Sequence, residues 1–152
     1  MKQLKPFLMR CIPFLLCIAF CIFVMTSFRI VVTDGNSMRP TYTPGDIVLC
    51  FRSYGSPEQG DPVLIHHMGK WMVKRVQAVP GDLFTVNSLP EGSVQEGMTD
   101  YWRTTDDFAI PEDFYFVTGD NPPESNDSRY ETFGLVKENE IWGTVLFILK
   151  NR

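Results

Sequence analysis

Ser37 and Lys74 are the residues of this chain whose types and settings best suit covalent chemistry. Ser37 follows Gly35 and Asn36 in a turn-like segment, and Lys74 lies in an apolar, strand-like stretch. A serine and a lysine can form a hydrolase without histidine, because the hydroxyl attacks a carbonyl carbon while a neutral amine removes its proton. Such a pair requires a lysine that loses its charge near neutral pH.

The strand pattern around Lys74 predicts this loss of charge. Side chains alternate along an extended strand, so Lys74 shares a face with Met72 and Val76, whereas Arg75 lies on the other face. Burial among apolar groups disfavours an ammonium and lowers the lysine pKa. Arg75 remains protonated in proteins, so it cannot be the base.

Histidine offers the competing mechanism, a serine–histidine hydrolase. His66 and His67 are the 2 histidines of the chain, and they are adjacent in a predicted strand. Their side chains would point to opposite faces, and no motif connects either of them to Ser37. We therefore expect Lys74, and not a histidine, to be the base.

A third polar segment follows an apolar strand pattern. Residues 119–129 are rich in Gly, Asp, Asn, Pro and Ser, and they come soon after the apolar Phe114–Val117. Polar loops that a rigid strand positions often carry binding or catalytic residues. A serine in a turn or a lysine in a strand is ordinary when taken alone, but the three segments together indicate one site.

These segments resemble the type I signal peptidases, which are membrane-anchored serine/lysine endopeptidases that remove leader peptides from exported proteins. The matching motifs are Ser37–Thr41 with Pro44–Asp46, Lys74–Val76 with Pro80–Asp82, and Gly119–Asn121 with Ser125 and Asp127–Arg129.

The resemblance implies a role for each matching residue. Ser37 would be the nucleophile and Lys74 the general base, with Ser125 orienting the lysine amine. It also implies two structural ion pairs, substrate contacts from the first motif, and no metal or cofactor. The ion pairs would join Asp127 to Arg129 and Asp120 to Arg75, and the substrate would contact Met38 and Pro40.

Stabilisation of the oxyanion is less fully specified by the sequence. Some longer members of the family carry a hydroxyl residue two positions before the nucleophile, where this chain has Gly35. The backbone amide of Ser37 is then the donor that the sequence offers for the developing negative charge. A second donor is not identified by any motif.

An uncharged stretch of membrane length precedes the motifs. No residue from Cys11 to Phe28 is charged, and about 18 residues approach the minimum for a helix that spans hydrocarbon. A removed leader peptide is the alternative, but its apolar run is about 7–15 residues long and ends at small residues. Met25–Arg29 does not fit such a cleavage site, so we expect an uncleaved anchor within residues 1–29.

The charge distribution predicts orientation and excludes one class of partner. Three basic residues precede the apolar stretch, so the positive-inside rule places the N-terminus in the cytoplasm and residues 30–152 outside it. All 18 acidic residues follow Arg29, with 10 of the 14 basic ones, so the exported part carries a net charge of −8. This acidity excludes a basic nucleic-acid-binding surface.

The cysteines provide no disulfide framework or metal site. Cys11, Cys17 and Cys21 lie in the apolar stretch, where a thiol behaves as a small apolar group, and Cys50 is alone beyond it. We expect Cys50 to have a packing role in the apolar segment around it, in preference to a reactive one.

The 152 residues suit one globular domain, residues 30–152, behind the anchor. Turn signals separate several short β-rich segments, which indicates a mainly β fold, and by the resemblance a signal-peptidase-like catalytic domain behind one transmembrane helix. Residues 87–110 lack periodicity and are expected to form a long loop or a small β excursion that could serve as a cap. The predicted strands are Asp46–Phe51, Pro62–His67, Trp71–Val79, Leu83–Val86, Phe114–Thr118 and Ile141–Leu149.

The expected function is that of a single-pass membrane endopeptidase that acts on secretory precursors at the lipid bilayer. An extended substrate would add a strand to an exposed sheet edge. Two alternatives stay open: a maturation peptidase dedicated to one pilin, conjugation or surface-assembly precursor, and a catalytically silent peptide-binding relative. A buried lysine costs desolvation energy that a silent relative does not need, which argues against the second alternative.

Overall fold

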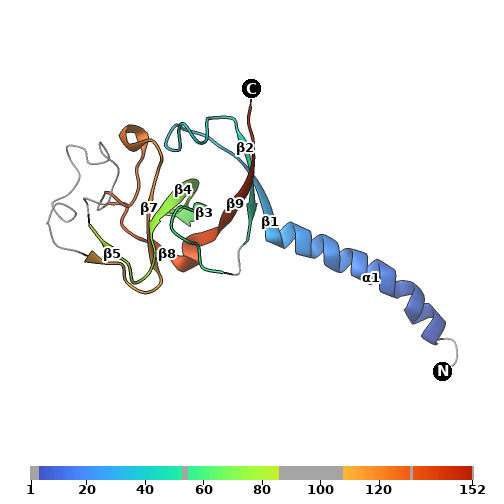
Figure 1. The fold of residues 1–152 in the computed structure, drawn as a ribbon. Coiled ribbons are helices and arrows are strands. Elements are labelled where there is room, and N and C mark those ends of the chain that lie inside the picture. Colours follow the sequence, from blue (N-terminus) through green and yellow to red (C-terminus); the bar gives the residue numbers. More distant parts are fainter. Residues whose placement is uncertain (1–3, 53–54, 86–107, 131, 152) are drawn as a thin grey trace.

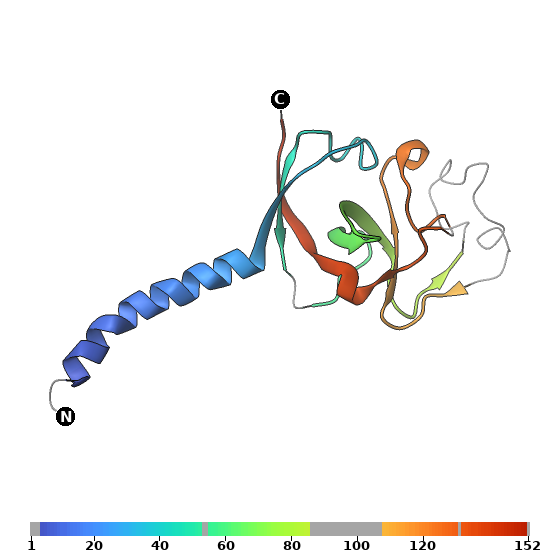
Figure 2. The same cartoon turned by 180° about the vertical axis from the view of Figure 1, so that it is seen from behind.

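A computed structural model describes residues 4–52, 55–85, 108–130 and 132–151. One helix, α1 (Leu4–Ser27), leads directly into a β-rich domain (Figures 1 and 2). In chain order the strands are β1 (Phe28–Val32), β2 (Ile47–Phe51), β3 (Pro62–His67), β4 (Lys70–Ala78), β5 (Leu83–Phe84), β6 (Phe108–Ala109), β7 (Phe114–Thr118), β8 (Val136–Lys137) and β9 (Ile141–Leu149). Two short 3₁₀ helices are η2 (Pro122–Glu124) and η3 (Glu138–Glu140).

The strands form an antiparallel arrangement. A 7-stranded sheet has the order β1-β2-β9-β3-β4-β7-β8, and β5 pairs with β6 in a separate 2-stranded sheet. This confirms the predicted mainly β fold class. Long-range pairing brings the last strand, β9, between β2 and β3, so segments far apart in sequence build one scaffold (Figure 1).

Both faces of the central hairpin are packed. Val63 and Val76 belong to one buried cluster with residues of β7 and β8, whereas Leu64 and Val73 belong to another with Met38. Strand alternation explains this division, because successive side chains point to opposite faces. Packing on both faces therefore fixes the hairpin of β3 and β4, and this hairpin is a rigid support for Lys74.

The boundary between the helix and the β domain lies earlier in the chain than the expected one after residue 29. α1 ends at Ser27, and Phe28 already pairs with Phe51 across β1 and β2. The carbonyl of Ser27 accepts a 2.8 Å hydrogen bond from the Arg52 amide. β1 thus crosses the boundary that was expected between residues 29 and 30, because pairing with β2 starts as soon as the helix stops.

The helix projects away from the sheet in both views (Figures 1 and 2). Several of its apolar side chains are exposed, among them Phe14, Leu16, Phe20 and Met25. Within the described residues, no helix combines the length and the apolar character of a membrane span.

Residues 87–110, which were expected to form a loop or small cap, lie mostly outside the described residues. At their described end, Phe108–Ala109 form the short strand β6, which pairs with β5. Ile110 is buried and exchanges hydrogen bonds with the turn before β5: its amide donates to Asp82 O and its carbonyl accepts from Gly81 N, both at 2.9 Å. The tight turn at Gly81 brings these segments together.

Candidate active site

The nucleophile candidate Ser37 lies in the connection between β1 and β2. Gly35 has a φ of +86°, which glycine adopts without a side-chain clash, so the chain can reverse just before Ser37. The turn is closed by hydrogen bonds from Arg39 N to Asn36 O (3.1 Å) and from Tyr42 N to Met38 O (2.9 Å). Met38 and Tyr42 are buried in the core, so the turn is anchored while Ser37 remains half-buried.

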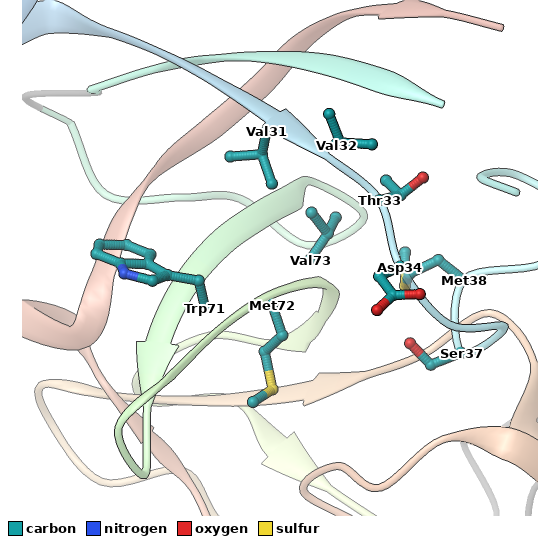
Figure 3. Close-up of a pocket in the computed structure, with 9 residues that line it drawn as sticks. All are labelled: Val31, Val32, Thr33, Asp34, Ser37, Met38, Trp71, Met72 and Val73. Carbon is teal, nitrogen blue, oxygen red and sulfur yellow. The ribbon is translucent and has the colours of Figure 1, made fainter. Parts of the chain in front are cut away.

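Ser37 faces a small pocket of about 130 Å³ (Figure 3). One wall comes from β1 and the residues after it, and the other comes from Trp71–Val73 of β4. Figure 3 shows Ser37 and Met38 at one end of the space between these walls. The lining residues are Val31, Val32, Thr33, Asp34, Ser37, Met38, Trp71, Met72 and Val73.

Lys74 lies in the middle of β4, opposite Val63 of β3, and is only 3% exposed. Its amine donates a 2.8 Å hydrogen bond to Ser125 Oγ. Burial lowers the pKa of this amine from 10.5 to about 8; the Asp127 carboxylate opposes that change, and the Arg129 cation adds to it. The predicted direction of the lysine pKa is thus confirmed, and a large fraction of the amine is neutral near pH 8.

Ser125 is held by a buried ion pair. Its hydroxyl donates to Asp127 Oδ2, which also accepts from Gly119 N at 2.8 Å. Arg129 binds the two carboxylate oxygens of Asp127 through Nε at 2.7 Å and Nη2 at 2.6 Å. A serine hydroxyl has a single hydrogen, so Ser125 can only accept from Lys74. The lone pair of a neutral Lys74 amine therefore points away from Ser125.

Gly119 lies between the two halves of the site. A Cβ atom at this position would overlap Ser125 Oγ and the carbonyl oxygen of Ser37. Only glycine lets the nucleophile turn and the Ser125 loop approach this closely. The motif pattern included Gly119 but did not mark it as a site residue, since contact with Ser37 is not visible in the sequence.

Arg75 and Asp120 form the second expected ion pair. The guanidinium donates to both carboxylate oxygens, from Nε to Oδ1 at 2.8 Å and from Nη2 to Oδ2 at 2.6 Å. Nη1 of Arg75 also donates to Gly60 O at 2.8 Å. This partly exposed ion pair connects β4 to the loop that carries Ser125. It lies on the face of β4 opposite Lys74.

Pro40, which the resemblance gives as a substrate contact, is exposed and does not line the pocket. Among the described residues, no hydrogen bond joins Ser37 Oγ to Lys74 Nζ.

The histidines have other partners. His67 is buried, with Nδ1 3.0 Å from Glu140 Oε1 and Nε2 2.9 Å from Phe133 O. His66 lies on the other face and stacks on Trp71 with 4.5 Å between ring centroids. Neither ring forms a hydrogen bond with Ser37 in the described part of the chain, which leaves Lys74 as the base candidate.

The sequence model of the family "Signal peptidase, peptidase S26" matches residues 7–90 and 87–150. The chain belongs to this family. It is 29% identical over 136 residues to a signal peptidase I of Bacillus amyloliquefaciens, covering 77% of this chain and 73% of that protein. It is 30% identical over 142 residues to signal peptidase I P of Bacillus subtilis subsp. natto, covering 80% of this chain and 76% of that protein.

A solved structure of a signal peptidase I from Enterococcus faecalis V583 is 28% identical, covers 62% of this chain and 100% of that chain, and has a TM-score of 0.42. The family match confirms the predicted resemblance to the type I signal peptidases and the predicted enzyme class, a serine endopeptidase of the signal peptidase type.

Proposed function

We propose that this signal peptidase cleaves leader peptides from secretory precursors with Ser37 as nucleophile and Lys74 as general base. The observation that carries the proposal is the buried Lys74 amine, whose pKa is lowered to about 8 and whose position is fixed by Ser125. A neutral amine beside a serine-bearing pocket is what lysine-dependent acyl transfer requires.

The reaction proceeds in two steps. Ser37 Oγ attacks the carbonyl carbon of the scissile bond while Lys74 takes the hydroxyl proton, and Lys74 then returns that proton to the departing amine. Water next hydrolyses the acyl-enzyme with the same lysine as base. Catalytic hydrogen bonds often tighten only in the substrate complex. We therefore propose that the hydrogen bond between Ser37 and Lys74 forms when the substrate binds.

The pocket favours an extended peptide with small side chains near the scissile bond. In the described part of the chain, β1 pairs with β2 alone. Trp71–Val73 of β4 pair there with β3 alone, because β7 pairs with β4 only from Arg75 onward. Both pocket walls therefore have a strand edge with backbone groups available to a peptide strand. A volume of about 130 Å³ favours small side chains.

The bilayer is proposed to hold enzyme and substrate together. α1 leads into a sheet whose outer face has exposed apolar side chains on three adjacent strands: Ile30, Val32, Ile47, Phe147 and Leu149. An apolar surface of this kind continuous with an apolar helix is typical of membrane contact. Anchoring of enzyme and leader peptide in one membrane raises their effective concentration.

Exposure of purified full-length protein to a panel of leader-bearing precursors tests the function. We expect cleavage of several precursors, with no cleavage by Ser37→Ala. Cleavage of one pilin-type or surface-assembly precursor alone would support a dedicated maturation peptidase. Binding of precursors by the wild type without any cleavage would support the silent peptide-binding alternative.

Orientation is tested by a cysteine introduced on the catalytic domain of a variant in which the three helix cysteines, Cys11, Cys17 and Cys21, are changed to alanine. Leu83 is 72% exposed, so Leu83→Cys offers an accessible thiol on the catalytic domain, in a chain whose Cys50 is buried. A membrane-impermeant maleimide should label this variant in intact spheroplasts. Labelling that requires permeabilised membranes would contradict an extracytoplasmic catalytic domain.

A further inference from the structure

Residues 36–37 of the nucleophile turn are held by a second loop through contacts that the mechanism has not used. The backbone amide of Asn121 donates to Ser37 O at 2.9 Å, and its side-chain Nδ2 donates to Asn36 O at 3.0 Å. One residue therefore binds the carbonyl groups on both sides of the Ser37 backbone.

The bond from Asn121 to Asn36 O, together with the Arg39 N–H that donates to the same oxygen at 3.1 Å, determines a direction that matters for catalysis. The Asn36 carbonyl and the Ser37 amide belong to one planar trans peptide unit, so their C=O and N–H groups point in opposite directions. A carbonyl fixed toward Asn121 directs the Ser37 N–H away from it. Among the described residues this N–H donates to no protein group, so it is available to an oxyanion.

Glu124 braces the same contact. Its Oε2 accepts a 2.7 Å hydrogen bond from Asn36 Nδ2, and its Oε1 is 3.5 Å from Asn121 Nδ2. Glu124 ends the short helix η2, which begins with Pro122 and Pro123, and proline restricts the backbone. The brace thus connects both asparagine side chains to a stiff segment.

We infer that Asn121 is a positioning residue for the oxyanion site: its side chain orients the Asn36–Ser37 peptide so that the Ser37 N–H faces the developing negative charge, and Glu124 supports it. The inference rests on the proposed function, in which Ser37 is the nucleophile. Asn121 acts through the Ser37 amide and does not itself contact the reacting atoms.

Asn121→Ala separates orientation of the amide from binding of the peptide. One oxyanion donor is worth about 10²- to 10³-fold in kcat, and loss of its orientation should remove part of this, about tenfold, with KM unchanged. Asn121→Asp, which keeps the shape but places a carboxylate oxygen against Asn36 O, should lose more. Asn126→Ala, at an exposed position in the same loop, is the matched control and should retain wild-type kcat.

A peptide aldehyde corresponding to the leader sequence provides a second measurement. The Ser37 hydroxyl adds to the aldehyde carbon, forming a C–O bond, while its proton passes to Lys74 and the former carbonyl oxygen becomes an alkoxide at the Ser37 N–H. Affinity for the aldehyde should fall in Asn121→Ala by the same factor as kcat, whereas affinity for an uncleavable peptide of the same sequence should not change.

Glu124 variants test the brace. Glu124→Gln retains a carbonyl oxygen for Asn36 Nδ2 and should keep most of the activity, while Glu124→Ala should lower kcat a few-fold and aldehyde affinity by the same factor. Equal effects of the two substitutions would contradict the brace.

The outcomes distinguish this inference from the proposed function. Wild-type protein that neither cleaves precursors nor binds the aldehyde would overturn both. Wild-type protein that does both, with an Asn121→Ala variant that is unchanged or that loses affinity for aldehyde and uncleavable peptide alike, would overturn the positioning role alone.

Discussion

Lys74 and Arg75 are adjacent cations on one strand, and their surroundings differ completely. Lys74 is buried, and within the described residues its hydrogen-bond partner is a neutral hydroxyl, that of Ser125. Arg75 is partly exposed and forms a two-pronged ion pair with Asp120. Burial lowers the pKa of the lysine to about 8, whereas the Asp120 hydrogen bond raises the pKa of the arginine.

This difference separates chemistry from support. A buried cation next to a hydroxyl is poorly compensated, so it releases its proton readily. A guanidinium bound to a carboxylate keeps its proton and holds two chain segments together. Strand alternation places the two neighbours on opposite faces, so one can serve catalysis and the other structural support. The predictions below test these two roles separately.

Removal of the nucleophile or the base should have the largest effect. We expect Ser37→Ala and Lys74→Met each to lower kcat/KM by about 10⁴-fold or more, and the double variant to be no worse, because the two groups act as one unit. Precursor cleavage at fixed enzyme concentration measures this. The matched change Arg75→Met should leave substantial activity; equal losses at positions 74 and 75 would contradict the division of roles.

Gly119→Ala should disrupt the contact between the two halves of the site. The added methyl group would overlap Ser125 Oγ and the Ser37 carbonyl oxygen, and displacement of reacting groups by about 1 Å can cost about 10²-fold in rate. Gly69→Ala is the control, since a Cβ there meets nothing within 4 Å although φ is +75°. It should reduce thermal stability with little loss of kcat. Wild-type turnover in Gly119→Ala would show that this close packing is not needed.

The scaffold was predictable from the sequence where periodicity and turn signals agree. The predicted ranges for β3, β7 and β9 match the structure residue for residue. β1 was missed because Phe28 continues the uncharged run of the helix with no turn signal between them, and β8 because two residues carry no periodicity. Whether 87–107 form a cap lies outside the described residues.

The site was predictable to a different extent. The motifs identified Ser37, Lys74 and Ser125 as candidates, and their catalytic roles remain predictions. The contact from Asn121 to the Asn36 carbonyl was not predictable, because it joins a side chain to backbone 85 residues away. Such contacts depend on how two loops pack and leave no pattern in either loop.

The rate of precursor cleavage should fall at acidic pH, because Lys74 becomes protonated there. If neutral Lys74 is the base, kcat/KM should decrease about tenfold per pH unit below a midpoint near pH 8, the lowered pKa of its amine. Stopped assays of one precursor between pH 5.5 and 9.5 measure the profile, with about a fiftyfold difference expected between pH 8, where half of the amine is neutral, and pH 6. Arg75→Lys should keep the same midpoint. A midpoint near the usual histidine value, lost on substitution of His66 or His67, would transfer the base role to histidine.

Ser125→Ala should have a smaller effect than removal of the base. The lysine amine loses the acceptor that fixes it, so we expect kcat to fall about tenfold or more with KM little changed. Asp127 keeps Arg129 and the Gly119 amide, so the fold should persist. Asp120→Asn, on the other side of the contrast, should lower stability by about 1 kcal/mol or less and leave kcat close to wild type. A larger kcat loss in Asp120→Asn than in Ser125→Ala would reverse the assignment.

The smallest effect concerns stability. The folded-state pKa of Lys74 is about 8, against an ordinary value of 10.5, so between these values the unfolded chain binds more protons than the folded one. Stability should therefore rise with pH through this window. Below pH 8, burial of the ammonium should lower the free energy of unfolding by the full effect of the pKa difference, about 3 kcal/mol.

Lys74→Met should then be more stable than wild type at pH 7, with an advantage that shrinks by pH 10. Urea unfolding of both proteins measures this, and Arg75→Met, whose lost cation does not titrate in this range, should show no such convergence. A pH-independent stability difference between Lys74→Met and wild type would mean that burial does not set the lysine charge.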